Sequence, residues 1–453
     1  MRFSVVTAGN SDESVLNSTL LKPPAIKMAS RILCQGRLAT VADIARWRMC
    51  LGCGACAYIC PEKKIVLRDF VAEGIRPVVQ GNGCEGCRKC LEVCPGYEND
   101  RREANGRAGV MKDLTEMWGP ILEIWEGHAA DAEIRHAGSS GGLITALSLY
   151  CLEKGGMHGV LHIGGDPENP VRNKTMMSRS RADLLKKTGS RYAPASACDR
   201  LDWVESAPGP CVFVGQPSEV TALAKAEELQ PQLKAKIGLT ISFFCAGSPA
   251  TQGTLDLLKS MGVDPGQVKE LRYRGNGWPG MFAVTLKGQP APAVQRSYAA
   301  SWGFVQAYRP LSAHLCPDGT GEDADISCGD PWYRPVQEGE AGSSLVLARS
   351  ERGREVLRGA MAAGYVVLEP SDGRKLYDSQ KNLAGKRGAV GGRLFVFKLA
   401  GLPVTRLKGF SLFKHWRRLS LEEKLRSTLG TARRIITRKL FRPLRLDAKD
   451  VHG

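Results

Sequence analysis

Two runs of cysteines carry the clearest chemistry in this chain. Each run reads C-x2-C-x2-C-x3-C-P, a spacing that wraps three thiolates around a 4Fe–4S cubane and offers the fourth to a neighbouring cluster. The first run is Cys50, Cys53, Cys56 and Cys60, and the second is Cys84, Cys87, Cys90 and Cys94. The sequence therefore predicts two 4Fe–4S clusters and a protein that transfers electrons.

The same spacing predicts how the ligands are shared. We expect one cluster on Cys50, Cys53, Cys56 and Cys94, and the other on Cys84, Cys87, Cys90 and Cys60. Gly52, Gly54 and Gly86 fall inside the loops, where the backbone must pass close to inorganic sulfide. A zinc ribbon needs no third cysteine and no Cys-Pro ending, and a disulfide framework needs an oxidising compartment, so both alternatives are weaker.

The composition is that of an ordinary globular protein. The chain has 453 residues, 15 cysteines and a formal net charge of +17. The length suggests two or three domains, and the apolar share can bury a sizeable core. The seven cysteines outside the runs have no regular spacing and look like reduced core thiols. No signal-peptide pattern is present, and no apolar run approaches the roughly 18–20 residues of a transmembrane helix. We therefore expect a cytoplasmic protein, which could also make peripheral contact with the inner face of a membrane.

Local patterns divide the chain into four parts. We expect a mobile N-terminal arm over residues 1–40, an α+β ferredoxin-like module over 41–105, a larger α/β domain over 114–398 and a basic helical tail over 401–453. Within the module, the segment KKIVLRDFVAEGIRPVV predicts a hairpin that turns near Gly74, and the polar residues 98–109 predict a linker.

The larger domain alternates apolar runs with segments of helical periodicity, which predicts a mostly parallel or mixed sheet covered by helices. The expected strands are GVLHIGG, PCVFVGQ, KIGLTISFFC and SLVLAR. The expected helices are GGLITALSLYCLEKG, SEVTALAKAEEL and TQGTLDLLKSMG.

The tail is strongly basic, with 14 Lys or Arg against 4 Asp or Glu from residue 401 onward. Ser420 and Glu423 predict a capping box at the start of a helix. The apolar residues that follow recur every three or four positions: Leu421, Leu425, Leu429, Ala432, Ile436 and Leu440. Such a helix favours an anionic membrane surface. The alternative is a helix that docks on its own domain and leaves its charged side in solvent. No base-reading module accompanies the charge, so nucleic acid is not an expected partner.

A loop of small residues, Ser139, Ser140, Gly141 and Gly142, leads directly into the helix that begins near Leu143. Exposed N–H groups and the positive end of the helix dipole suit a phosphate at such a place. An ordinary N-cap also favours Ser and Gly, so this alternative stays open. No G-x-G-x-x-G follows a strand, and the usual dinucleotide fingerprint is absent.

Four further stretches accompany this loop: TGSRYAPAS (188–196), FVGQPSEVTAL (213–223), FFCAGSPATQGT (243–254) and ADISCGDPW (324–332). In order and spacing they resemble the coenzyme F420 hydrogenase/dehydrogenase beta-subunit family, over roughly residues 45–370. That family includes flavoprotein reductases that act on deazaflavin and other conjugated acceptors.

The resemblance implies a non-Rossmann FAD site. Ser139, Ser140, Gly141 and Gly142 would lie at the phosphate or ring edge of the flavin, Gly189, Ser190, Arg191 and Tyr192 would form a second wall, and Asp330 would belong to the site. Arg191 stands where the family usually has Lys, which keeps the charge and changes its geometry. Asp330 could instead make a tight turn. Tyr192 and His136, and also His314, are candidate proton donors, although a lone histidine is more often structural.

The resemblance also points to a third cluster in many relatives, held by four cysteines of the larger domain. The matching positions here are Ser218, Cys245, Ala313 and Cys316. Since a cubane needs a thiolate on each iron, we expect no third cluster in this chain.

These features together predict an oxidoreductase. Electrons would pass from reduced ferredoxin or a similar low-potential donor, through two clusters, to FAD and on to a conjugated acceptor, because one-electron carriers are matched to a two-electron flavin. The alternative is an electron-transfer subunit that works with other redox subunits and has no substrate of its own. A third interpretation is a domain that has lost its flavin.

Overall fold

The computed structural model describes residues 38–81, 84, 86–103, 106, 108–337 and 339–446. The expected mobile arm lies almost wholly outside these residues. At the centre is an eight-stranded sheet in the order β14-β4-β13-β12-β8-β7-β5-β6. Its strands are β4 (Glu123–Ala129), β5 (Gly159–Gly165), β6 (Asn173–Ser178), β7 (Cys211–Gly215), β8 (Ile237–Phe243), β12 (Ile326–Gly329), β13 (Ser344–Ala348) and β14 (Val366–Pro370).

The middle of this sheet is parallel and its edges are antiparallel. Strands β5, β7, β8 and β12 pair in parallel, while β6, β13, β4 and β14 pair antiparallel. The expectation of a mostly parallel or mixed sheet is confirmed. The predicted strands appear as β5, β7, β8 and β13. They were readable as continuous apolar runs because both of their faces are covered.

Neighbouring residues of these strands supply two cores. Leu161 and Phe213 pack with α10 (Pro217–Leu229), while Val160 and Val212 pack with α7 (Leu143–Glu153) and α15 (Glu351–Ala362). This alternation is the period-two geometry of a strand with a helix layer on each side. Helix α10 begins two residues after β7 ends, so its N-terminus lies beside the carboxyl end of that parallel strand.

The N-terminal module contains α2 (Val41–Arg46), α3 (Ala55–Ile59), the hairpin of β1 (Ile65–Phe70) and β2 (Gly74–Val79), and α4 (Lys89–Glu92). The predicted hairpin is confirmed, and Gly74 begins its second strand with φ +83°.

The expected linker over residues 98–109 is wrong at its start. Glu98–Asp100 forms β3, which pairs in parallel with β15 (Arg406–Lys408). Arg101 follows, is only 1% exposed and forms ion pairs with Asp318 and Asp323. A local pattern could not reveal this strand, because its partner lies about three hundred residues further along the chain.

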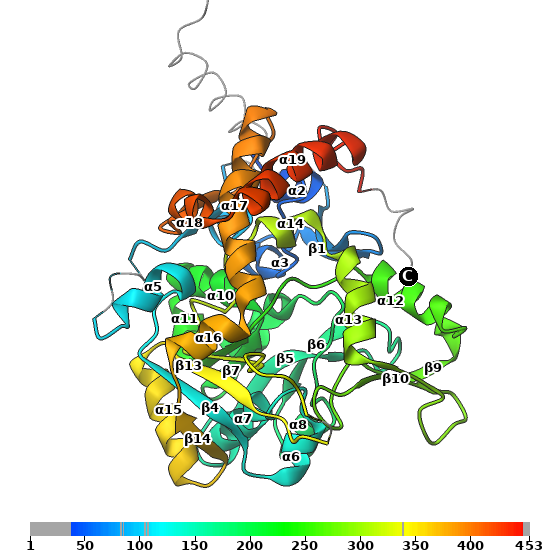
Figure 1. The fold of residues 1–453 in the computed structure, drawn as a ribbon, viewed down its shortest axis with the longest axis vertical. Coiled ribbons are helices and arrows are strands. Elements are labelled where there is room, and N and C mark those ends of the chain that lie inside the picture. Colours follow the sequence, from blue (N-terminus) through cyan, green and yellow to red (C-terminus); the bar gives the residue numbers. More distant parts are fainter. Residues whose placement is uncertain are drawn as a thin grey trace, which may run out of the picture.

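A separate lobe holds a three-stranded antiparallel sheet, β9 (Val268–Arg272), β10 (Met281–Leu286) and β11 (Val294–Ser297), which packs with α12 (Thr251–Ser260) and α13 (Tyr298–Val305) (Figure 1). The remaining short helices are α5 (Lys112–Trp118), α6 (Ala132–Ala137), α8 (Arg181–Leu185), η2 (Ala197–Arg200), α9 (Leu201–Glu205), α11 (Pro231–Lys236), η3 (Pro265–Gln267), η4 (Gln306–Tyr308), α14 (Leu311–Leu315) and α16 (Gly373–Ser379).

The C-terminal part adds a layer of three helices, α17 (Lys381–Leu399), α18 (Leu412–Arg418) and α19 (Leu421–Thr437), above the N-terminal module (Figure 1). The helices cross closely because α17 is rich in glycine: a Cβ on Gly392 would come within 2.4 Å of Trp416 Nε1. The predicted capping box is confirmed, since Ser420 Oγ accepts from Glu423 N and the Glu423 carboxylate accepts from Ser420 N. Among the described residues, no helix is long and apolar enough to cross a membrane.

Candidate cluster and flavin sites

The cysteines of the first run are all buried, whereas Cys84 and Cys87 of the second run are exposed. Burial raises the pKa of the Cys53 thiol well above its usual range, and Cys94 and Cys50 raise it further. Burial also raises the pKa of the Cys90 thiol, and there the nearby thiols are Cys87, Cys60 and Cys84. Cys94 thus lies near the thiols of the first run and Cys60 near those of the second, and the two groups adjoin, since Cys90 also raises the pKa of Cys56.

These two groups are compatible with the exchange of each run's last cysteine between clusters, and the ligand sets stay a prediction. The donor chemistry fits the cofactor, because iron would relieve the repulsion between crowded thiolates. The loops fit as well: Gly52, Gly54 and Gly86 all adopt positive φ. In the described part of the chain, no group of three or more His, Cys, Asp or Glu side chains lies close enough together to hold a single metal ion. A cubane requires a different arrangement, with one thiolate on each of four irons.

The first cysteine loop is fastened directly to the larger domain. Ser196 Oγ donates to the Gly52 carbonyl at 2.6 Å, and Cys198 N donates to the Cys53 carbonyl at 3.0 Å. The contact leaves no room for a side chain at Gly54, where a Cβ would lie 2.9 Å from Asp199 N. The segment around residues 196–199 is therefore the immediate neighbour of the expected first cluster.

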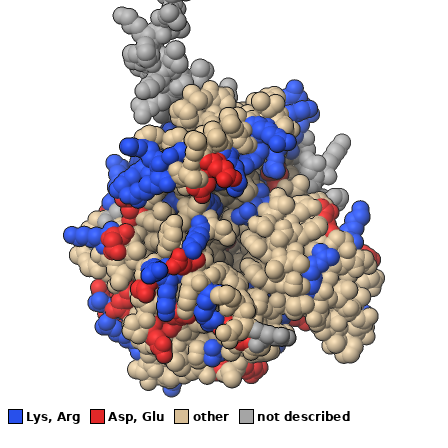
Figure 2. All heavy atoms as spheres, in the orientation of Figure 1, with Lys and Arg blue, Asp and Glu red and all other residues tan. Residues whose placement is uncertain are grey.

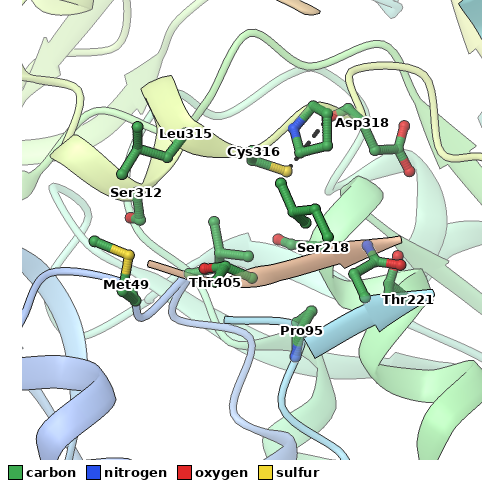
Figure 3. Close-up of a pocket in the computed structure, with 13 residues that line it drawn as sticks. Met49, Pro95, Ser218, Thr221, Ser312, Leu315, Cys316, Asp318 and Thr405 are labelled. Atoms are coloured by element: carbon green, nitrogen blue, oxygen red, sulfur yellow. Dashed lines mark hydrogen bonds between the residues drawn. The ribbon is translucent and has the colours of Figure 1, made fainter. Parts of the chain in front are cut away.

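The four positions that the resemblance connects with a third cluster do converge. Ser218, Cys245, Ala313 and Cys316 line one cavity of about 40 Å³, together with Gln216 and Lys386 among others. A second small cavity shares Ser218 and Cys316, and Figure 3 places it between the N-terminal module, at Met49 and Pro95, and α14. Residues of the N-terminal module and residues of the larger domain therefore line these two cavities together.

Of the cysteines in the described part of the chain, only Cys245 and Cys316 line this cavity, and the Lys386 ammonium group lines it with them. Burial raises the pKa of Cys245 and raises that of Cys316 to about 11, and Lys386 of α17 opposes both shifts. Ser218 supplies a hydroxyl, and Ala313 supplies no donor. The absence of a third cluster stays a prediction, and this cavity is the place where such a cluster would have to bind.

The two loops that the resemblance assigns to a flavin lie against each other. Ser190 N donates to Ser139 Oγ at 2.5 Å. Ser140 Oγ donates to the Ser343 carbonyl, and Gly141 N donates to Ser344 Oγ. The 139–142 loop is thus held at the N-terminus of α7, an eleven-residue helix whose N-cap is Gly142 with φ +72°.

Arg191 is placed differently from the other residues of this group. Its guanidinium donates to the carbonyls of Leu271 and Pro170, both at 2.7 Å, and to Asn173 Oδ1. It also lies over the ring of Tyr273. Because these protein groups bind the guanidinium, Arg191 holds the 189–192 loop against the lobe that carries β9.

A third loop, which was not predicted from the sequence, lies at this place: residues 274–280, with the sequence RGNGWPG. Gly275, Asn276, Gly277 and Gly280 adopt positive φ. Gly277 N donates to the His136 carbonyl at 2.9 Å, and Arg272 Nη1 reaches the carbonyls of Ala137 and Thr188. The 274–280 loop therefore lies beside the segments that lead into both expected loops. Its density of Gly, Asn and Pro was the available signal.

Asp330 anchors the 274–280 loop. Its two carboxylate oxygens accept from the Arg274 guanidinium at 2.8 and 2.9 Å, and Oδ1 also accepts from Trp278 Nε1 at 2.9 Å. Asp325, from the same ADIS stretch, has another task. It accepts from Thr240 N and pairs with Arg352, which ties the sheet to α15.

Aromatic rings gather around these loops. Trp332 stacks between Trp278 and Tyr298, with centroids 5.1 and 5.9 Å apart. Tyr192 packs against Trp302 at 4.9 Å. Stacked rings of this kind suit a flat conjugated ligand. The face drawn in Figure 2 is hollowed near its centre, between the sheet domain and the lobe that carries α13 and β10.

The candidate histidines separate in space. His136 is exposed on α6, and its carbonyl supports the 274–280 loop. His314 lies under α17, where its carbonyl accepts from Arg393. Burial, with help from Arg309 and Arg393, lowers the pKa of His314 to about 3. His314 is therefore neutral at physiological pH and is a poor proton donor.

Comparison with known proteins places the chain in a class. Residues 124–201 match the family model for the N-terminal part of the coenzyme F420 hydrogenase/dehydrogenase beta subunit, and residues 210–373 match the family model for its C-terminal part. Residues 49–97 match a 4Fe-4S dicluster domain. The chain belongs to the coenzyme F420 hydrogenase/dehydrogenase beta-subunit family, and it is an iron–sulfur protein of an oxidoreductase family.

Several curated proteins are similar to it. An uncharacterised protein of Methanocaldococcus jannaschii is 22% identical over 75% of this chain and 94% of its own length. The coenzyme F420-dependent sulfite reductase of that organism is 24% identical over 68% of this chain, which spans only 45% of the reductase. The coenzyme F420 hydrogenase subunit beta of Methanosarcina barkeri is 24% identical over 56% of this chain and 83% of its own length.

Among solved structures, a chain of the F420-reducing [NiFe] hydrogenase complex from Methanosarcina barkeri is similar, with 23% identity and a TM-score of 0.48. The match covers 62% of this chain and 94% of that one.

Proposed function

We propose that this chain is an iron–sulfur flavoprotein oxidoreductase. It takes electrons from a low-potential donor such as reduced ferredoxin and delivers them to a conjugated acceptor of the deazaflavin type. One observation carries this proposal. The segment 189–198 contacts Ser139 of the expected flavin loop through Ser190, and it contacts the first cysteine loop through Cys198. Ten residues thus connect both expected redox sites.

The connecting segment is held in place by the sheet. Asn173 Nδ2 donates to the Ala193 carbonyl at 2.9 Å, and Thr175 Oγ1 donates to the Ser196 carbonyl at 3.1 Å. Both donors lie on β6. A fixed segment keeps the distance between the two sites constant, which an electron relay requires.

The residues present fit the cofactors that this function needs. The eight cysteines of the two runs would hold two 4Fe–4S clusters. The 139–142 loop at the N-terminus of α7 would hold the FAD phosphates, and the rings around Trp332 would lie against the flavin ring. When bound, the clusters supply single electrons and FAD supplies a two-electron carrier. Tyr192, half-buried beside these rings, is the better candidate to hold a proton at its hydroxyl, and the exposed His136 is the second.

A specific observation also favours the rival function, an electron-transfer subunit with no substrate of its own. Cys84 and Cys87 are exposed. They would bring the edge of one cluster to the surface, where a redox partner could exchange electrons with it. Relatives of this chain are named as beta subunits.

Anaerobic purification followed by cofactor analysis and an activity assay tests the proposal. We expect about eight irons per chain for two cubanes, with bound FAD, and reduction of a deazaflavin by the isolated chain with reduced ferredoxin. Activity that appears only after a partner subunit is added would favour the rival function. Iron without flavin would overturn the flavoprotein and support the third interpretation.

A further inference from the structure

Exposed apolar side chains are concentrated in the C-terminal helices. In the described part of the chain, thirteen large hydrophobic residues are markedly exposed, and eight of them lie between residues 395 and 441. These eight are Phe395, Leu399, Phe413, Leu421, Leu425, Leu429, Ile436 and Phe441. Single exposed apolar residues are normal, but such a concentration marks an interaction surface.

Helix α19 packs on the body through a different side from its apolar stripe. Ser427 and Thr431, together with Ile435, are at most 7% exposed and recur every four residues, so they form the packing side. Leu421, Leu429 and Ile436 are 64–73% exposed. The helix therefore docks on its own domain, as the alternative expected, but it does so through this other side: most of its apolar stripe stays exposed, and Leu440 just after the helix is buried.

Cations flank the exposed stripe. No acidic residue occurs from residue 424 to 446. Exposed basic residues precede, accompany and follow α19: Arg417, Arg418, Arg426, Arg433, Arg438, Lys439 and Arg442. In Figure 2 blue side chains gather over this end of the molecule, beside α18 and α19. Of the two acids in the first turn, Glu422 pairs with Arg426 and Glu423 caps the helix.

We propose that α18 and α19 form a docking surface for an anionic membrane. The stripe of Leu421, Leu425, Leu429 and Ile436 enters the boundary between headgroups and acyl chains, and the flanking cations meet the anionic headgroups. The matched family segments end at residue 373, so this surface lies outside the part of the chain that they cover. The proposal goes beyond the proposed function.

Charge argues against a second copy of this chain as the occupant. A two-fold interface places the same patch on both sides. The cations of α18 and α19 would then face each other. The acids of these two helices, Glu422 and Glu423, are already engaged by Arg426 and by the capping box, so opposed like charges disfavour such an interface. An anionic bilayer supplies the missing negative charge together with an apolar layer.

Flotation of the full-length chain, with its clusters, tests the proposal. We expect it to float with vesicles of phosphatidylcholine and phosphatidylglycerol, to stay unbound with phosphatidylcholine alone, and to dissociate as salt screens the charges. The double variant Leu425→Gln/Leu429→Gln removes the apolar contact and should bind roughly tenfold more weakly or worse. The variant Arg433→Gln/Lys439→Gln should lose roughly fivefold for each cation.

Val367→Gln is the matched control, since Val367 is an exposed apolar residue on β14. It should float like the unmodified chain. All substituted side chains are exposed, so iron content should stay unchanged. A chain that does not bind anionic vesicles, or a stripe variant that still binds them fully, overturns the proposal. A dimer or protein complex that the stripe variants abolish, without any flotation, also overturns it. Flotation requires no turnover and is therefore independent of the proposed function.

Discussion

At the scale of single residues, the ion pair of Arg274 and Asp330 organises the candidate flavin site. Arg274 is 2% exposed and also lies 4.3 Å from the centre of the Tyr298 ring. The resemblance identified Asp330 from its ADIS stretch but could not say what it holds, because its partners come from the 274–280 loop. The sequence identified the carboxylate, and only the structure identifies its cation.

We therefore expect Asp330→Asn to release the 274–280 loop. The variant leaves a buried guanidinium without its counter-charge, at a cost of roughly 3 kcal/mol. Flavin per folded chain should fall, as measured by absorbance after denaturation of the purified protein. Asp325→Asn is the control: it should lower thermal stability through loss of the Thr240 and Arg352 contacts, but keep its flavin. Equal flavin loss in both variants would contradict the assignment.

Glu227 on α10 gives a prediction about pH. Burial raises its pKa to about 7, with Arg352 acting in the opposite direction. Because the folded pKa lies above the unfolded value, folding retains the proton. The associated stability is complete below about pH 4.5 and is lost as the pH rises through about 7.

Glu227→Gln should therefore raise the free energy of unfolding relative to the unmodified chain near pH 8, by at most about 3 kcal/mol, and change it little near pH 5. Thermal unfolding at the two pH values measures this difference. Glu228→Gln removes a carboxylate from the neighbouring exposed position and is the control for the change in net charge. A Glu227→Gln gain of equal size at both pH values would rule out this titration.

At the scale of elements, segments with a clear local pattern were predictable and segments with distant partners were not. The buried parallel strands β5, β7 and β8 and the helices α7, α10 and α12 have patterns that depend on local sequence alone. The strands β4, β12 and β14 and the 274–280 loop depend on partners from distant parts of the chain. The four positions that the resemblance connects with a third cluster could each be identified from the sequence. That they line one cavity could be seen only in the fold.

This convergence permits a gain-of-ligand experiment. Ser218→Cys/Ala313→Cys would place four thiols around the cavity that Cys245 and Cys316 already line. We expect the iron content after anaerobic reconstitution to rise from about eight to about twelve per chain. Ser218→Cys/Ser312→Cys adds the same number of thiols to the same cavity and should stay near eight. An unmodified chain that already holds about twelve irons would show that the expected absence is wrong.

At the scale of the whole molecule, the C-terminal helices cover the cluster module. Val390, Leu394 and Phe397 of α17 and Ile435 of α19 share one buried core with Cys50, Cys56 and Cys60. The layer therefore has two sides: one closes the core beside the cysteines, and the other presents the exposed stripe. A protein docked through that stripe would hold its cluster module close to the membrane.

Phe397 and Phe395 test the inner side of this layer. They lie two residues apart on α17 and are 2% and 57% exposed. Phe397→Ala should open a cavity in the shared core, cost roughly 3–5 kcal/mol and speed the loss of cluster absorbance in air. Phe395→Ala should leave this bleaching rate unchanged. Equal rates in the two variants would mean that α17 does not protect the clusters.

The pairing of β3 with β15 also has a consequence for the time course of synthesis. Arg406 pairs with Glu98, so the partner strand is made 308 residues later (406 − 98). At typical translation rates this delay is about 15–60 seconds. During that interval the nascent cysteine loops exist without their covering helices, and iron and sulfide can reach them. The order of synthesis thus leaves a stage in which the expected clusters would load before the C-terminal helices close over them.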